Sequence, residues 1–267
     1  MSVFKDQLQR EVVVNDVPLR IVSLVPSITE LLFDLGLENE VVGITKFCVH
    51  PETWFRTKTR VGGTKNIKVD VVAALQPQLI IANKEENVRE QIGQLENISP
   101  VWVTDVSTLE DALSMIKEIG IITNRSEQAD IIAKKIECGF ENLRSSARGV
   151  RACYLIWNDP YMSIGSDTFI HDMLRRCGFE NIFADCTRYP EVSVDQIKSA
   201  GCKIVFLSSE PFPFKQKHVE TLQTQLPGCN ILLVDGEMFS WYGSRLISAA
   251  GYFQHLVNKI GSGNKKL

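Results

Sequence analysis

The sequence lacks any apolar run that approaches the roughly 18–20 residues of a membrane-spanning helix, so we expect no membrane insertion. It also lacks an excess of positive charge: the formal net charge is −3, which argues against nucleic acid as a partner. The opening residues, MSVFKDQLQREVVVND, have neither the basic nor the apolar region of a signal peptide. As the sequence stands we expect a cytoplasmic protein, and a periplasmic or cell-surface location would need a leader missing from it.

Metal and disulfide signatures are missing as well. The seven cysteines are odd in number, scattered, and form no Cys-x-x-Cys pair, which argues against a disulfide framework or a zinc knuckle. The four histidines are far apart in the sequence. We therefore expect no metal site built from these residues.

The sequence has no nucleophile elbow, no Walker pattern, no dinucleotide-binding glycine motif and no His-Glu-x-x-His. These absences favour a binding protein over an enzyme. A remote alternative is a metal-assisted hydrolase that uses His50, Asp159 and Glu210.

What the sequence does contain is an alternation of short apolar runs with amphipathic stretches. Val41–Ile44, Leu79–Ala82 and Val101–Val103 are predicted as strands, and helices are predicted between them. Ser27 and Glu30 are spaced as a capping box for a helix that Gly36 ends. The pattern predicts an α/β fold with two Rossmann-like lobes and mostly parallel sheets.

The predicted organisation has four parts. Residues 1–19 form an N-terminal extension, 20–123 an N-terminal α/β lobe, 124–147 one long backbone helix and 148–267 a C-terminal α/β lobe. The lobes are similar in sequence: Val69–Leu75 and the apolar run after it align without gaps on Val194–Ala200 and its following run. A stiff helix between two lobes would leave a cleft, which is a common place for a small-molecule site.

The loops that follow the predicted strands are rich in aromatic residues, prolines and polar residues. Because parallel strands present their carboxyl ends at one edge of a sheet, we expect these loops to form a binding site. The candidate ligand-binding residues come from these loops, from the sequence after the last predicted strand and from the resemblance described next. They are Pro26, Ser27, Phe47, His50, Gly63, Trp157, Tyr161, Tyr189, Glu210, Glu237, Phe239, Trp241 and Arg245.

Several of these segments together resemble one family. Arg20–Glu52, Tyr161–Gly165, Gly178–Phe183, Ser209–Phe214 and Trp241–Arg245 are similar to segments of the periplasmic-binding-protein family with a helical backbone, which serves cobalamin, ferric-siderophore and haem importers. The resemblance covers about Arg20–Ile260 and is nearest to the cobalamin-binding subgroup. It implies non-covalent binding of a corrinoid in the cleft, with no catalytic cofactor.

The resemblance also suggests roles for single residues. Phe47 occupies the place of an aromatic residue that contacts the corrinoid, and Glu237–Trp241 occupies a loop that contacts it. Trp157, Tyr161, Phe239 and Trp241 would pack on the ligand with Phe47, and Pro26, Ser27, Glu237 and Arg245 would frame it. Arg245 could instead be structural, through a salt bridge with an acidic neighbour such as Glu237.

Other ligands remain open at this stage. An anionic ferric siderophore would favour basic residues, and Lys46, Lys65, Lys84 and Arg188 are available; haem would favour an iron ligand such as Tyr161, Tyr189 or His50. A cytosolic carrier or sensor of a corrinoid or iron chelate is a further reading. Family members dock on the permease of an ABC importer through one acidic residue on each lobe, where this chain has Arg89 and Thr224, with Glu90 and Glu220 close by. We expect a monomer.

Overall fold

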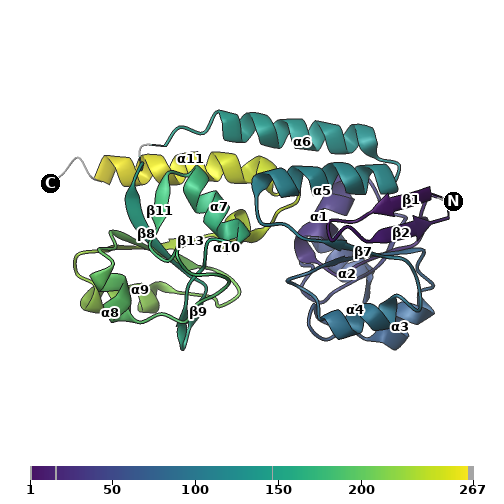
Figure 1. Ribbon diagram of the computed structural model, residues 1–267, viewed down its shortest axis with the longest axis horizontal. Coiled ribbons are helices and arrows are strands. Elements are labelled where there is room, and N and C mark those ends of the chain that lie inside the picture. The colour runs from purple at the N-terminus through teal and green to yellow at the C-terminus, as the bar shows by residue number, and fades with distance from the viewer. Residues whose placement is uncertain (1, 16, 146, 264–267) are drawn as a thin grey trace. The chain divides into compact units, whose positions relative to one another are not determined.

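The computed structural model describes residues 2–15, 17–145 and 147–263, and in it the chain divides into two units (Figure 1). The N-terminal unit comprises Met1–Val106, Glu110–Ile136 and Tyr242–Arg245, and the C-terminal unit comprises Ser107–Leu109, Glu137–Trp241 and Leu246–Leu267. Within the described residues, no helix has both the length and the apolar character needed to cross a membrane.

The N-terminal unit is built on a parallel sheet of five strands in the order β5-β4-β3-β6-β7. The strands are β3 Ile21–Ser23, β4 Val41–Ile44, β5 Thr59–Arg60, β6 Leu79–Asn83 and β7 Val101–Thr104. The central β3 and β6 are completely buried and rich in isoleucine and valine, as expected for a sheet covered on both faces.

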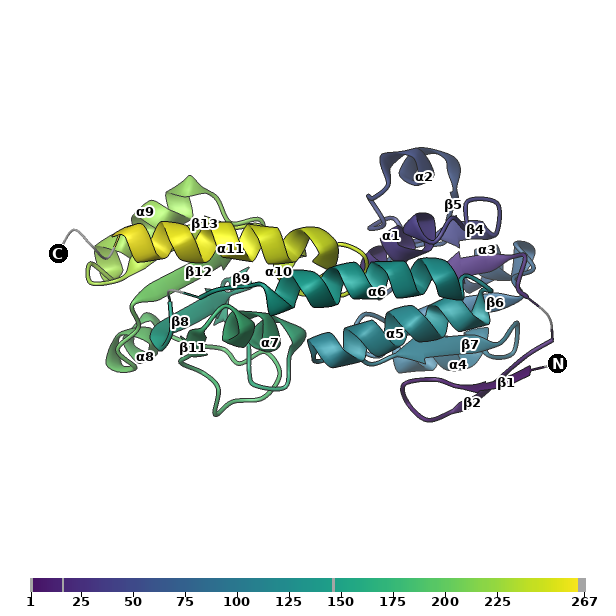
Figure 2. The same cartoon turned by 90° about the horizontal axis from the view of Figure 1, so that it is seen from above.

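Helices cover both faces of this sheet. On one face, Val72 of α3 (Val69–Ala74) and Ile92 and Leu95 of α4 (Arg89–Leu95) pack against alternate residues of β3, β6 and β7. On the opposite side, α5 (Leu109–Ile122) lies along the β7 end of the sheet in both Figure 1 and Figure 2. The remaining helices that begin in this unit are α1 Pro26–Asp34, α2 Glu52–Thr57 and α6 Ser126–Glu141.

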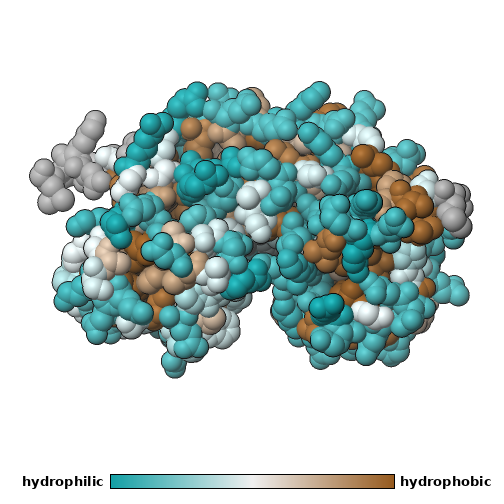
Figure 3. All heavy atoms as spheres, in the orientation of Figure 1, coloured by the Kyte–Doolittle hydropathy of each residue, from teal (hydrophilic) through white to brown (hydrophobic). Residues whose placement is uncertain are grey.

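An N-terminal hairpin, β1 Ser2–Lys5 and β2 Glu11–Val14, occupies part of the predicted extension. Its turn holds the buried carboxylate of Asp6, which pairs with Arg10 at 2.7 Å and accepts the backbone N–H of Val103 on β7 at 3.2 Å. Val3 and Val13, which are 60% and 40% exposed, share one side of the hairpin with the exposed Lys5 and Glu11, and Figure 3 shows apolar surface near the N-terminus. Burial alternates along β2, but its three consecutive valines do not show that alternation in the sequence, and our prediction assigned no structure there.

The C-terminal unit has a parallel sheet of four strands in the order β11-β8-β12-β13. The strands are β8 Val150–Leu155, β11 Phe179–Asn181, β12 Ile204–Ser208 and β13 Asn230–Val234. A short antiparallel hairpin, β9 Trp157–Asn158 and β10 Tyr161–Met162, follows β8.

The two faces of this sheet differ in composition. One is aliphatic and cysteine-containing, with Ile197 of α8 (Val194–Ser199) and Leu222 of α9 (Gln216–Gln225) in its core. The other is aromatic: the Phe239 ring contacts those of Tyr154, Phe206 and Phe253, and Tyr154 also contacts Phe206. Its helices are α7 Phe169–Arg176, α10 Gly236–Ser240 and α11 Leu246–Gly263.

The two sheets repeat one topology, as the internal sequence similarity predicted. The order β4-β3-β6-β7 corresponds to β11-β8-β12-β13, and in both units a short helix (α3 or α8) leads into the strand paired to the first one. Gly36 after α1 and Gly178 after α7 both adopt a positive φ, +77° and +84°, that glycine takes without strain. The α/β fold with mostly parallel sheets is therefore confirmed.

Two local predictions are wrong. The long helix was predicted over 124–147, but α6 ends at Glu141, so it is about 24 Å long at 1.5 Å per residue. The capping box of Ser27 and Glu30 does not form: Val25 is the N-cap of α1 and makes no side-chain hydrogen bond. Pro26 at the first helical position fits this start without a cap.

The C-terminal unit holds a buried carboxylate whose contribution to stability depends on pH. Burial alone would raise the pKa of Asp172, but hydrogen bonds from Arg176 and Arg175 at 2.7 and 2.8 Å and from the Leu109 N–H at 2.9 Å outweigh it, and the net pKa is lowered from 3.8. A lowered folded-state pKa stabilises the fold above the unfolded-state pKa, and this stabilisation is lost as pH falls through the folded-state value.

We expect Asp172→Asn to lower the free energy of unfolding by about 2 kcal/mol at pH 7, because hydrogen bonds to a charged group are worth more than neutral ones. The difference from wild type should shrink below about pH 4, as urea unfolding across pH 3–7 would measure. Glu180→Gln, which breaks an exposed ion pair with Arg151, is the control and should change little. A difference that is constant with pH would contradict the assignment.

Candidate functional site

Phe47 is the most exposed aromatic side chain at the carboxyl ends of the N-terminal strands. It lies three residues after β4, and 50% of its surface is exposed. The ring packs closely on Gly63, where an added Cβ would lie 3.2 Å from Phe47 Cε2, and the Lys46 ammonium lies 4.9 Å from its centroid. The loop thus holds a ring that is supported from within the unit and open to a ligand.

Buried hydrogen bonds hold the base of this loop. The Cys48 thiol contacts the hydroxyls of Thr29 and Thr45, each at 3.1 Å, and the Phe47 N–H donates to Thr45 Oγ1 at 3.3 Å. Burial raises the pKa of Cys48, so this thiol is an internal packing group and not a nucleophile. The network fixes the backbone on which Phe47 stands.

Arg245 pairs with Glu30. Its Nε and Nη2 donate to the two carboxylate oxygens at 2.9 and 2.7 Å, and both side chains are mostly buried. Arg245 thus forms a salt bridge with an acidic residue of its own unit, as the structural alternative expected, and that residue is Glu30. Burial raises the pKa of Glu30 in spite of Arg245, and His50 is among the groups that act on it electrostatically.

Pro26 and Ser27 begin α1 at the end of β3. Ser27 is buried, and its carbonyl would lie 2.5 Å from a Cβ added at Gly243, so only glycine fits there. Pro26 is partly exposed and remains available to a ligand.

The lysines considered for an anionic ligand have partners within their own unit. Lys84 pairs with Asp105 at 2.6 Å, and the Lys65 ammonium bonds to the Glu85 carbonyl. Lys46 lies over the Phe47 ring.

In the C-terminal unit an exposed ring, Trp157, lies on the hairpin after β8. It is 41% exposed, its Nε1 donates to the Asp159 carbonyl at 3.2 Å, and Phe212 supports it edge-on at 5.7 Å between centroids. Each unit thus presents a large exposed ring on the loop or hairpin that follows a parallel strand.

The two tyrosines suggested as iron ligands are partly buried. Burial, and then the charge of Asp159, raises the pKa of Tyr161, which disfavours the phenolate that ferric iron needs. Tyr189 lies against the guanidinium of Arg188, 5.7 Å from its ring centroid.

Glu210 follows β12 and is bonded to the segment after β13. Ser240 Oγ and Trp241 Nε1 donate to the same carboxylate oxygen at 2.5 and 3.0 Å. Burial raises the pKa of Glu210, and the nearby Glu237 and Asp235 add to this. Sequence reasoning treated Glu210 and Trp241 as separate ligand contacts and gave no role to Ser240.

Phe239 needs a correction, because it belongs to the core. It is completely buried, with its ring centroid 4.7 Å from that of Phe253 and 5.1 Å from that of Tyr154. Such packing leaves no face of the ring for a ligand. The short helix α10 turns this side chain inward.

The structure groups no metal ligands. Among the residues described, no three His, Cys, Asp or Glu side chains are placed to hold an ion. His50 lies in the N-terminal unit, whereas Asp159 and Glu210 lie in the C-terminal one.

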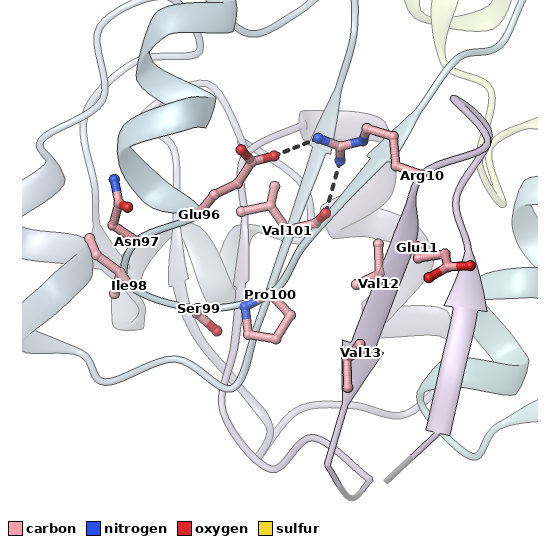
Figure 4. Close-up of a pocket in the computed structure, with 10 residues that line it drawn as sticks. All are labelled: Arg10, Glu11, Val12, Val13, Glu96, Asn97, Ile98, Ser99, Pro100 and Val101. Atoms are coloured by element: carbon pink, nitrogen blue, oxygen red, sulfur yellow. Dashed lines mark hydrogen bonds and ion pairs between the residues drawn. The ribbon is translucent and has the colours of Figure 1, made fainter.

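A surface pocket of about 630 Å³ lies elsewhere, between β2 and the segment Glu96–Val101 (Figure 4). Arg10 crosses one end of it and bonds to Glu96 Oε1 and to the Val101 carbonyl, at 2.5 and 3.0 Å. Because Glu96–Val101 leads into β7, this pocket is at the amino end of the strand and separate from the loops described above.

The acidic residues considered for docking are both exposed. Glu90 lies in the first turn of α4 and Glu220 lies on α9. Arg89 and Thr224, which stand at the aligned positions, are exposed as well.

Comparisons with known proteins agree with this architecture. The model of the periplasmic binding protein family matches residues 21–227. The vitamin B12-binding protein of Pectobacterium carotovorum subsp. carotovorum is 26% identical over 240 residues, which are 87% of this chain and 86% of that protein.

Solved structures resemble the chain in fold. The periplasmic vitamin B12 binding protein BtuF of Vibrio cholerae superposes with a TM-score of 0.77 at 19% identity, covering 92% of this chain and 98% of that one. The periplasmic heme binding protein HutB of Vibrio cholerae gives 0.76 at 21% identity, covering 89% and 98%. Since the family model covers most of the sequence and the folds agree, the chain belongs to the periplasmic binding protein family.

Proposed function

We propose that this protein binds a corrinoid non-covalently, through the strand-end loops of its two units. The observation that carries the proposal is the pair of exposed rings, Phe47 and Trp157, each packed against residues of its own unit and each in the segment that follows a parallel strand. Rings of this kind provide large, stiff contact area for a flat macrocycle. The named function of relatives at about a quarter identity supports the same ligand.

The charge of the C-terminal loops favours a corrinoid over haem. Glu210, Asp235 and Glu237 lie close enough for their charges to interact. Haem carries two carboxylates, which the partly exposed Asp235 and Glu237 would repel, whereas a corrinoid carries neutral amide side chains whose N–H groups carboxylates accept. The internal partners of Lys65 and Lys84 weaken the case for an anionic ferric chelate in the same way.

The test is ligand retention. Purified protein is incubated separately with cobalamin, haem and a ferric siderophore, desalted, and its visible spectrum recorded. We expect about one equivalent of retained cobalamin. Retention of haem or of the siderophore in its place would identify the ligand as an iron compound, and retention of none of the three would overturn the proposal.

Removal of the supported ring should weaken binding measurably. We expect Phe47→Ala to raise the Kd for cobalamin about tenfold, because burying half of a phenylalanine side chain is worth about 1–1.5 kcal/mol. Equilibrium dialysis gives the Kd. Phe33→Ala is the matched control, since Phe33 is 39% exposed but lies near the end of α1, away from the strand-end loops. Equal effects of the two variants would contradict the assignment.

We extend the proposal to transport. The exposed Glu90 and Glu220 would meet basic residues of a permease, as in importer-linked family members, which would place the protein in the periplasm or at the cell surface. A carrier or sensor in the cytoplasm is the alternative. Charge reversal of both glutamates should abolish binding to a permease and leave cobalamin affinity unchanged.

A further inference from the structure

Glu210 joins two segments that are thirty residues apart. Its Oε1 accepts from Ser240 Oγ at 2.5 Å and from Trp241 Nε1 at 3.0 Å. Both donors lie at the end of α10, where the backbone of Trp241 is extended, with φ −89° and ψ 101°. The indole is 6% exposed, and its hydrogen bond to Glu210 is a directional restraint on how the ring is turned.

The backbone that carries Glu210 is held by hydrogen bonds of its own. Ser208 Oγ donates to the Glu210 carbonyl at 2.6 Å, and the Gly236 N–H donates to Ser209 Oγ at 2.9 Å. A Cβ on Gly236 would lie 2.7 Å from Glu210 Cγ, so the absence of a side chain at 236 makes room for the glutamate. The two strand ends are therefore locked together around Glu210.

The bonds from Ser240 and Trp241 also explain how an acid is tolerated here. Asp235 and Glu237 oppose ionisation of Glu210, as does burial, while the two donors favour it. A buried carboxylate that loses its donors leaves an uncompensated charge, so the donors and the acid depend on each other.

We propose that Glu210 is a positioning residue that sets the orientation of the Trp241 indole, and through it the shape of the ligand-binding surface of the C-terminal unit. It acts through Trp241 and Ser240, not as the ligand contact assigned from the sequence. The part of this inference that concerns the ligand rests on the proposed corrinoid binding; the part that concerns the indole does not.

The indole is tested first, without ligand. The chain has four tryptophans, so isotope-labelled protein should give four indole N–H signals in NMR spectra, and Trp241→Phe identifies the one from Trp241. We expect Glu210→Ala to shift that signal and to speed its exchange with solvent about tenfold, because a hydrogen bond to a carboxylate is lost. Asp195→Asn, an exposed acid on α8, is the control and should leave the signal in place.

The ligand is tested second. Glu210→Ala should raise the Kd for cobalamin about tenfold, Glu210→Gln should raise it less because the amide keeps an acceptor oxygen, and Glu210→Ala should add little in a Trp241→Phe background. If Glu210→Ala does not fold, Glu210→Gln provides the test of affinity in its place.

The outcomes separate the two claims. An unchanged Trp241 signal in Glu210→Ala, or additive effects of the two substitutions on Kd, overturns the positioning role. A shifted signal in a protein that retains no cobalamin supports the positioning role and overturns the proposed function.

Discussion

Replacing Phe239 with alanine is expected to lower the free energy of unfolding of the C-terminal unit by about 3–5 kcal/mol. The ring is completely buried and contacts Tyr154, Phe206, Tyr252 and Phe253. Truncation removes both the transfer free energy of the ring and its packing contacts, and the cavity between four large rings cannot close without moving the sheet.

Urea unfolding followed by far-ultraviolet circular dichroism measures this change, fitted with separate transitions for the two units if they do not coincide. Phe239→Leu is the matched control: it keeps most of the apolar volume and should cost about 1–2 kcal/mol. If Phe239→Ala lowered the free energy of unfolding by less than 1 kcal/mol and abolished cobalamin binding, Phe239 would be a ligand contact and not a core residue.

Phe239 illustrates what the sequence can and cannot determine about such a site. Its place after a strand is readable, since the apolar run Ile231–Val234 precedes it and β13 is observed as Asn230–Val234. The direction of its side chain depends on α10, a five-residue helix too short to have a periodicity of its own. Phe47 and Trp157 look no different in sequence, yet they are exposed.

The strands and their repetition were predictable because they rest on local patterns. Val41–Ile44 has the predicted bounds, and the alignment of Val69–Leu75 on Val194–Ala200 corresponds to the helix-to-strand units α3–β6 and α8–β12. Apolar runs between turn residues define such elements without knowledge of the partner strand.

Pairings between distant residues were not predictable in the same way. Glu30 has the spacing of a capping residue, but its carboxylate is bound to Arg245, 215 positions along the chain. Likewise, Glu210 finds Trp241 only because β12 and β13 are neighbours in the sheet. A single sequence carries the residue types of such contacts but not their partners.

Arg245→Met is the second substitution with a large expected effect, a loss of about 3–5 kcal/mol in the free energy of unfolding at pH 7. Both oxygens of Glu30 are bound by Arg245, at 2.7 and 2.9 Å, and the two side chains are only 19% and 15% exposed. Removal of one partner leaves a buried charge without compensation, which costs more than the pair contributes. Methionine keeps most of the apolar stem, so the loss reports the charge.

The pH dependence of the variant's stability identifies the uncompensated charge of Glu30 as the cause of this loss. Burial already raises the pKa of Glu30, and without Arg245 that pKa should rise further, so the folded variant binds a proton that the unfolded chain does not. Stability of the variant should then increase, relative to wild type, as pH falls from 7 towards 5, which urea unfolding at each pH would show.

The double variant Glu30→Gln/Arg245→Met separates a structural role from a ligand-binding one. With no charge left to compensate, it should recover at least half of the stability lost in the single variant. If Arg245 serves the fold alone, the double variant should also bind cobalamin as tightly as wild type. Recovered stability with a weakened affinity would show that the guanidinium contacts the ligand as well, because only a direct contact is lost when the fold is intact.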